Sequence, residues 1–336
     1  MTKLAKLSIA AIALVGMSAT AGTLQDVQKA GFVKCGVNIG ATGFSEASTG
    51  GEYKGLDVDG CRSVAAAVLG DASKVKYVGL NAKERFAALQ SGEIDILYRG
   101  TTWTETRDTA LGLNFAGVNF YDGQGFLVNK KLGVKSALEL DGAAVCVQSG
   151  TTTELNLADY FKSNGMKYKS VSYDSNDQVT SSFEAGRCDV LTSDSSQLYG
   201  IRSKLKNPSA YEVLPQIISK EPLGPVVRQG DDQWFNIAKW TFFATVAAEE
   251  NGITSKNIDS LKNSKNPTVR RIIGVDGKLG ANLGLNKDWA YQIIKQVGNY
   301  GEIFERNVGE NTPLQIKRGL NALWTKGGLQ YSPPFK

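Results

Sequence analysis

One alternation of strands and helices occurs twice along the chain, and this repeat constrains the fold more than any other feature of the sequence. In the first half, apolar strands are predicted at residues 32–37, 74–78 and 94–98, with helices at 57–69 and 83–90. In the second half, strands at 143–148, 169–173 and 188–192 alternate with helices at 154–162 and 179–184. Such an order predicts a parallel sheet covered by helices, and two copies predict two open α/β lobes.

The segments around the repeats indicate how the lobes are joined. Residues 123–129 are expected to cross into the second lobe and residues 219–229 to return, which makes a two-strand hinge. A helix over 232–248 should then pack on the first lobe, and 297–307 is also predicted to be helical. Residues 251–286 are rich in turn residues, and 327–336 are expected to form an irregular strap. We therefore divide the chain into a first lobe (22–122), a second lobe (123–220), and the rest of the first lobe with a C-terminal extension (221–336).

Residues 1–21 are predicted to be a signal peptide. Lys3 and Lys6 precede an apolar run over 7–17, and Ala19-Thr20-Ala21 fits an A-x-A cleavage site. The alternative is a buried helix that begins at residue 1. Cleavage near Gly22 predicts a periplasmic protein, and loss of two lysines lowers the formal charge from +5 to +3. No basic run suggests a nucleic-acid partner.

The cysteines favour disulfides over a metal or redox site. The chain has four cysteines, no C-x-x-C spacing and no histidine, so we expect neither a zinc site nor any other cofactor. Export permits disulfides, and the two halves favour Cys35–Cys61 and Cys146–Cys188, with free buried thiols as the alternative. The lack of histidine also excludes Ser-His and Cys-His catalysis.

Polar residues follow three of the predicted strands, where open α/β sheets bind ligands. An arginine fork suits a carboxylate, a helix N-terminus attracts an anion, and an aspartate can hold an ammonium group. Together they describe a receptor for a zwitterion, with Phe44 as an apolar wall. The residues are Thr101, Thr102 and Arg107 after the strand at 94–98, Thr151 and Thr152 after the strand at 143–148, and Asp194 after the strand at 188–192.

Each of these features also has a simpler explanation. Thr102 or Thr104 could cap a helix that leaves Arg107 on the surface. Thr151 and Glu154 fit a plain capping box. Asp194 could be the N-cap of the next helix, and a single phenylalanine such as Phe44 is more often a core residue.

These residues lie in phrases that resemble solute-binding protein family 3, in particular its general L-amino-acid-binding periplasmic proteins. The phrases are GLDVD at 55–59, RFAALQSGEID at 85–95, TTWT and RDT within 101–109, GVNFYDGQGF at 117–126, the run at 148–154, and AGRCD at 185–189. The resemblance implies a type II periplasmic-binding-protein fold. It also implies that Arg107, Thr102 and Thr152 bind the ligand's α-carboxylate, that Asp194 binds its α-amino group, and that Phe44 covers it. Arg99 stands where smaller residues are common, so it either selects acidic or amide side chains or faces solvent.

The resemblance implies a non-enzymatic function. The chain is expected to close over polar L-amino acids and to deliver them, as a monomer, to the permease subunits of an ABC importer. Because it carries no P-loop, the ATPase must be a separate protein. The alternative is a periplasmic dehydratase-like enzyme on the same fold, for which Glu46, Asp122 and Asp194 are candidate acids or bases.

Overall fold

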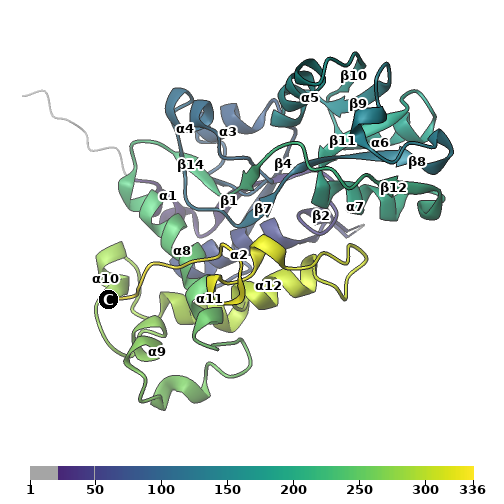
Figure 1. The fold of residues 1–336 in the computed structure, drawn as a ribbon. Coiled ribbons are helices and arrows are strands. Elements are labelled where there is room, and N and C mark those ends of the chain that lie inside the picture. Colours follow the sequence, from purple (N-terminus) through teal and green to yellow (C-terminus); the bar gives the residue numbers. More distant parts are fainter. Residues whose placement is uncertain (1–21, 49) are drawn as a thin grey trace, which may run out of the picture.

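The chain forms two α/β lobes joined by a pair of strands (Figure 1). The computed structural model describes residues 22–48 and 50–336. The predicted signal peptide, residues 1–21, lies outside the described residues. Within the described part of the chain, no helix is both long enough and apolar enough to span a membrane.

The first lobe is built on a five-stranded mixed sheet. Its strand order is β4 (Val75–Leu80), β1 (Val33–Asn38), β5 (Ile96–Leu97), β14 (Val226–Arg228) and β6 (Leu113–Phe115). The first three strands are parallel, as the sequence predicts, whereas β14 runs antiparallel to β5 and β6. Its helices in this part of the chain are α1 (Thr23–Ala30), α2 (Leu56–Leu69), α3 (Arg85–Ser91) and α4 (Glu105–Ala110), and a short ribbon joins β2 (Glu46–Ala47) to β3 (Tyr53–Lys54).

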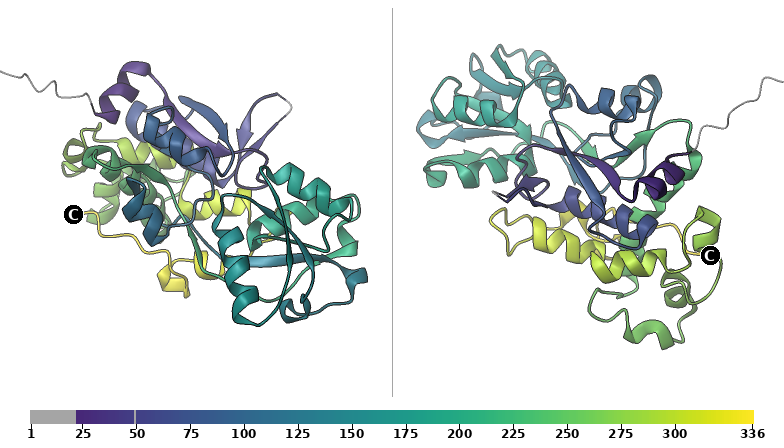
Figure 2. Two further views of the ribbon diagram at one scale, coloured as in Figure 1. Left: turned by 90° about the horizontal axis from the view of Figure 1, so that it is seen from above. Right: turned by 180° about the vertical axis from the view of Figure 1, so that it is seen from behind.

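The second lobe repeats this plan. Its strand order is β10 (Lys169–Tyr173), β9 (Ala144–Gln148), β11 (Val190–Asp194), β8 (Gln124–Asn129) and β12 (Tyr211–Val213). The strands β10, β9 and β11 are parallel, and β8 is antiparallel to both β11 and β12. The helices of this lobe are α5 (Thr152–Ser163), α6 (Asn176–Glu184) and α7 (Ser195–Lys204). Figure 2 shows the two lobes side by side, with the second lobe in teal.

The hinge lies slightly earlier in the chain than the sequence predicts. Strand β7 (Phe120–Asp122) pairs antiparallel with β13 (Glu221–Leu223), and Asp122 lies opposite Glu221. The predicted crossover at 123–129 is instead mostly β8, a strand inside the second lobe's sheet. The reason is that residues 124–128 are buried on both faces of that sheet, which local sequence cannot distinguish from an apolar crossover.

The C-terminal region covers the first lobe with helices (Figure 1). They are α8 (Asp232–Glu250), α9 (Pro267–Ile272), α10 (Leu279–Leu283), α11 (Trp289–Gln296) and α12 (Tyr300–Asn307). The single helix predicted at 297–307 is wrong at its start, because Gly298 has φ 102° and Asn299 caps α12. The strap at 327–336 contains no helix or regular strand, and it buries Phe335 against Trp240 and Trp289.

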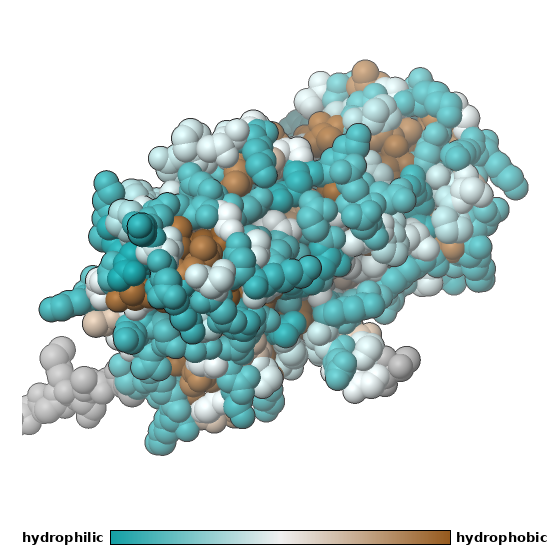
Figure 3. Space-filling model, turned by 90° about the horizontal axis from the view of Figure 1, so that it is seen from below, coloured by the Kyte–Doolittle hydropathy of each residue, from teal (hydrophilic) through white to brown (hydrophobic). Residues whose placement is uncertain are grey.

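Short 3₁₀ helices complete the secondary structure of the described residues. They are η1 (Lys130–Leu132), η2 (Ala137–Glu139), η3 (Pro208–Ala210), η4 (Ser260–Asn263), η5 (Gly319–Asn321) and η6 (Trp324–Lys326). The face seen in Figure 3 is mostly hydrophilic, with separate brown hydrophobic patches.

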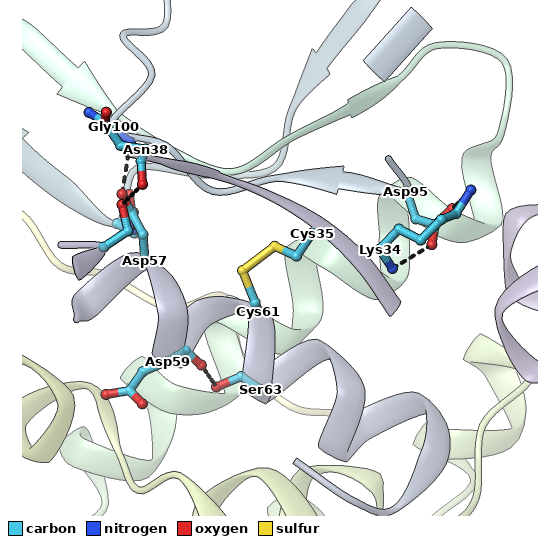
Figure 4. The surroundings of a disulfide bond; sticks show 11 residues. Lys34, Cys35, Asn38, Asp57, Asp59, Cys61, Ser63, Asp95 and Gly100 are labelled. Atoms are coloured by element: carbon cyan, nitrogen blue, oxygen red, sulfur yellow. Dashed lines mark hydrogen bonds and ion pairs between the residues drawn. A yellow bond between two sulfur atoms is a disulfide. The ribbon is translucent and has the colours of Figure 1, made fainter. Parts of the chain in front are cut away.

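Each lobe contains one disulfide. Cys35–Cys61 joins β1 to α2 (Figure 4), and Cys146–Cys188 joins β9 to the turn before β11. Both predicted pairings are confirmed, and no described cysteine is free. Each bond ties a central strand of a sheet to a neighbouring segment, so each stabilises its own lobe.

Candidate functional site

A polar cavity lies where the carboxyl ends of both parallel strand sets face each other. Asn38 ends β1, Gln148 ends β9 and Asp194 ends β11, and all three line the cavity. About 450 Å³ of space within it, including space open to solvent, is not filled by protein atoms. The other lining residues are Arg85, Arg99, Gly100 and Thr102 from the first lobe, and Thr151, Thr152, Thr153, Asn176, Thr192, Ser193 and Gln197 from the second.

The two lobes touch across this cavity. The hydroxyl oxygens of Thr102 and Thr152 are 3.3 Å apart. At the rim, Lys83 pairs with Asp174 at 2.6 Å, and Lys204 on α7 pairs with Glu46 at 2.5 Å. The structure therefore shows the lobes in a closed arrangement.

The first lobe supplies two buried arginines to the cavity wall. Arg99 donates from Nε to the Leu80 carbonyl at 3.0 Å and from Nη2 to Asn38 Oδ1 at 3.4 Å. Burial lowers the pKa of Arg99 to about 10 and holds the pKa of Arg85 well below its usual value. The charge of Arg107 lowers both pKa values further, and that of Arg99 also lowers the pKa of Arg85. Arg99 is 3 % exposed, so the alternative that it faces solvent is wrong.

Arg85 is a site residue that sequence reasoning missed. It is 2 % exposed, and its Nε has no hydrogen-bond partner among the described residues. It opens helix α3, directly after the loop that leaves β4. Since that loop also leaves the carboxyl end of a parallel strand, the strand-end rule applied to residues 81–85 could have found it.

Arg107 lies behind the cavity wall. Thr104 caps α4 by accepting from the Arg107 amide at 3.2 Å, as one alternative expected. The guanidinium is nevertheless buried, with 8 % of the residue exposed, so its placement on the surface is wrong. Its Nη1 donates to the Thr102 carbonyl at 2.9 Å, and its guanidinium carbon lies 5.3 Å from the centre of the Phe86 ring. Arg107 is not among the lining residues, and it contacts the cavity wall through Thr102.

Asp194 lines the cavity from the second lobe. It occupies the N-cap position of α7 but makes no capping hydrogen bond with its side chain. Its Oδ1 has no partner among the described residues. Burial raises the pKa of Asp194 well above its usual value, Asp122 and Glu221 raise it further, and Arg85 and Arg107 lower it. Helix capping therefore does not account for this side chain.

The threonines divide into caps and hydrogen-bond donors. Thr151 accepts from the Glu154 amide at 3.3 Å, and Glu154 Oε2 accepts from the Gly150 amide at 3.1 Å. The helix start is therefore a capping box in which Glu154 binds the amide one residue before the N-cap. The hydroxyls of Thr102 and Thr152 both donate to Glu221 Oε2, at 2.5 and 2.9 Å. Sequence reasoning also missed Glu221, because a hinge strand carries no strand-end signal.

Besides Arg107, two residues predicted for the site do not line the cavity. Phe44 is 1 % exposed and packs edge-on against Phe120, with ring centres 5.1 Å apart, because Gly43 at φ 78° turns the chain into the first lobe's core. Thr101 is fully buried, and its hydroxyl has no partner among the described residues.

The residues proposed for acid–base chemistry are placed outside the cavity, apart from Asp194. Glu46 is paired with Lys204 at the rim. Asp122 accepts from the amides of Gly123 and Ser196, at 2.8 and 3.3 Å, and burial raises its pKa to about 6. Among the described residues, no cluster of acidic or cysteine side chains could hold a metal ion.

Asp57 holds one edge of the site in place. Its Oδ2 accepts from the Gly100 amide at 2.9 Å (Figure 4). Its Oδ1 accepts from Asn119 Nδ2 at 3.4 Å. Burial raises the pKa of Asp57 to about 7, against the lowering effects of Asn119, Gly100 and Arg99. Asp57 thereby fixes the turn that carries Arg99 and Thr102.

Comparisons with known proteins give consistent matches over the chain. The sequence model of the bacterial extracellular solute-binding proteins, family 3, matches residues 33–256. The General L-amino acid-binding periplasmic protein AapJ of Rhizobium johnstonii is 61% identical over 330 residues, which are 97% of each protein. The Glutamate/glutamine/aspartate/asparagine-binding protein BztA of Rhodobacter capsulatus is 53% identical over 330 residues, 98% of each.

A solved structure matches both the sequence and the fold. It is an ABC transporter periplasmic binding protein from Brucella ovis with glutathione bound. It is 55% identical, has a TM-score of 0.93, and covers 94% of this chain and 100% of its own.

Proposed function

We propose a function from one premise: the chain belongs to the bacterial extracellular solute-binding proteins, family 3. It is the periplasmic substrate-binding component of an ABC importer, and it captures polar L-amino acids by closing its lobes. The observation that carries this proposal is the closed cavity, with buried arginines on one wall and the Asp194 carboxylate on the other. A zwitterion supplies both opposite charges, and it can bridge the lobes only when they close.

The charges suggest how the ligand is oriented. The free N–H groups at the start of α5 hold the α-carboxylate, since helix N-termini bind anions. Arg107 joins them by turning from the Thr102 carbonyl towards the cavity. The hydroxyls of Thr102 and Thr152 donate to Glu221, so they offer the ligand oxygen lone pairs rather than protons. Those lone pairs, together with Asp194, suit the α-ammonium group.

The side-chain pocket favours carboxylate and amide groups. Arg85 and Arg99 line it with Asn38, and Asn176 lines it from the second lobe. Burying a bare alkyl side chain against these groups would leave buried charges unpaired, which is costly. This preference agrees with the ligands in the name of BztA.

Calorimetry against L-glutamate, L-glutamine, L-aspartate, L-asparagine, L-alanine, L-leucine and glutathione tests the proposal. We expect L-glutamate and L-glutamine to bind most tightly, and L-leucine weakly. In Arg85→Met, L-glutamate should lose about tenfold more affinity than L-alanine. A protein that bound none of the amino acids would contradict the function, and one that bound only glutathione would reassign its ligand class.

The acid–base alternative has little support in this site. A general acid or base must reach the ligand, and Glu46 and Asp122 lie outside the cavity, at the rim and at the hinge. The close relatives are named as binding proteins. We therefore assign no catalytic residue.

Location and partners follow from the same proposal. Residues 1–21 are removed on export, and residues 22–122, 123–220 and 221–336 form the first lobe, the second lobe, and the returning first lobe with its extension. The closed monomer docks on permease subunits that use a separate ATPase. Periplasmic protein should then have an N-terminus near Gly22 and a monomer's mass by light scattering.

A further inference from the structure

We infer that Glu221 is a positioning residue that links closure of the lobes to ligand binding. It lies in the hinge strand β13 and is 1 % exposed. Its carboxylate accepts hydrogen bonds from Thr102 at 2.5 Å, Thr152 at 2.9 Å, Asn156 at 2.6 Å and Ser219 at 2.7 Å. Among the described residues, no lysine or arginine forms an ion pair with it.

The donors to Glu221 come from both lobes. Thr102 follows β5 in the first lobe, whereas Thr152 and Asn156 lie on α5 of the second. If the lobes separate, α5 moves away and Glu221 loses two of its donors. A buried carboxylate is stabilised by such donors and is costly without them. Glu221 therefore stabilises the closed arrangement specifically.

Glu221 also orients two hydroxyls of the proposed ligand site. A hydroxyl has one proton, and both Thr102 and Thr152 donate theirs to Oε2 of Glu221. Their lone pairs are then the groups left for a ligand. Glu221 does not line the cavity, so it acts on the ligand through these two side chains. This role rests on the proposed function.

The charged groups that face Glu221 are Asp122, Asp194 and Arg107. The charge of Glu221 raises the pKa of Asp122 and of Asp194, and it raises the pKa of Arg107 against the effect of burial. A further negative charge placed beside Glu221 would therefore be close to three carboxyl groups, those of Glu221, Asp122 and Asp194. Only one buried cation, Arg107, would offset them.

Asn156→Asp tests the inference, because it replaces a donor to Glu221 by a carboxylate of the same shape. With L-glutamate as the probe at pH 8, the Kd should rise about tenfold or more, mostly through faster dissociation. At pH 5 the defect should shrink, because the introduced carboxyl can be protonated and donate again. A role limited to packing would not produce this pH dependence.

Lys204→Gln is the matched control, since it removes a cross-lobe ion pair at the exposed rim. Its Kd should change less than about threefold at either pH. Glu221→Gln provides a second variant, because an amide accepts at only one of its two ends and cannot satisfy all four donors. Wild-type Kd and dissociation rate in both Asn156→Asp and Glu221→Gln would overturn the inference.

The inference and the proposed function can fail separately. If the wild type bound no amino acid, the function would be wrong. X-ray scattering without ligand would then decide the role of Glu221. We expect a larger radius of gyration in Glu221→Gln and in Asn156→Asp than in the wild type, and equal radii would overturn it.

Discussion

The two lobes share one strand order but contribute opposite charges to the cavity. The first lobe supplies Arg85 and Arg99, with Arg107 behind its wall, and the second supplies Asp194 and the N-terminus of α5. Only the first lobe brings guanidinium groups to the cavity wall, and only the second brings a carboxylate that lines it. We therefore expect closure of the lobes to assemble the proposed binding site rather than merely to cover it.

The lobes also differ in how they are supported. The first lobe has one large hydrophobic core, to which α8, α11 and α12 of the C-terminal region contribute, and one smaller cluster. The second lobe has only two small clusters, and its disulfide lies in one of them, whereas the first lobe's disulfide lies in the large core. We therefore expect the second lobe to depend more on its disulfide.

The largest effect should come from the Cys146–Cys188 bond. Its cysteines are 42 residues apart, against 26 for Cys35–Cys61. Loop-entropy estimates give about 4 kcal/mol of unfolding free energy for the longer loop and about 3.5 kcal/mol for the shorter one. Denaturant unfolding of the two Cys→Ala double variants should show the greater loss in the second lobe. An equal or greater loss for the first lobe's pair would contradict our comparison of the cores.

Asp194→Asn should have the next largest effect, and it should act in opposite directions on binding and on stability. Removing one member of a desolvated charge pair should weaken amino-acid binding by about 2–4 kcal/mol. Ligand-free stability at neutral pH should rise, because burial makes the ionised carboxylate unfavourable there. Calorimetry and thermal unfolding measure the two quantities. Unchanged affinity would assign Asp194 a role in the second lobe's structure alone.

Sequence reasoning predicted the parts of the site that follow from local rules. The parallel strands, both disulfides and the lining positions of Thr102, Thr151, Thr152 and Asp194 come from periodicity and strand ends. It could not predict that Phe44 turns into the core, since that depends on Gly43 and on packing against Phe120. Glu221 was missed for a similar reason, because its donors are distant in sequence and meet only in the folded chain.

Arg107→Lys should weaken every amino-acid ligand by a similar factor, about 2 kcal/mol. Lysine keeps the charge but loses the planar fork that binds a carboxylate with two hydrogen bonds. It also loses the bond to the Thr102 carbonyl that joins α4 to the cavity wall. Ligand-induced compaction in X-ray scattering should decrease as well. A selective loss of L-glutamate, with neutral amino acids unaffected, would place Arg107 in the side-chain pocket instead and reverse the proposed ligand orientation.

The smallest predicted effect concerns pH and the Asp57 carboxyl that supports the first lobe's wall. Its pKa is about 7 in the folded chain, against a usual value of 3.8, because it is buried. The folded state therefore binds this proton more tightly than the unfolded state. The contribution of this proton to the free energy of unfolding is fully present below pH 3.8. It falls as the pH rises towards 7 and stays constant above that.

Between pH 6 and 8, linkage predicts a loss of about 1.4 kcal/mol from this one group. Asp57→Asn keeps the side-chain shape and removes the titration, so this part of the pH dependence should disappear. Denaturant unfolding of both proteins at pH 6, 7 and 8 measures it. Asp122 at the hinge, whose pKa is about 6, contributes a separate pH dependence of stability at lower pH. That contribution should persist in Asp57→Asn. If the two profiles were parallel, Asp57 would already be ionised at pH 6, and its bonds to Gly100 and Asn119 would outweigh the cost of its burial.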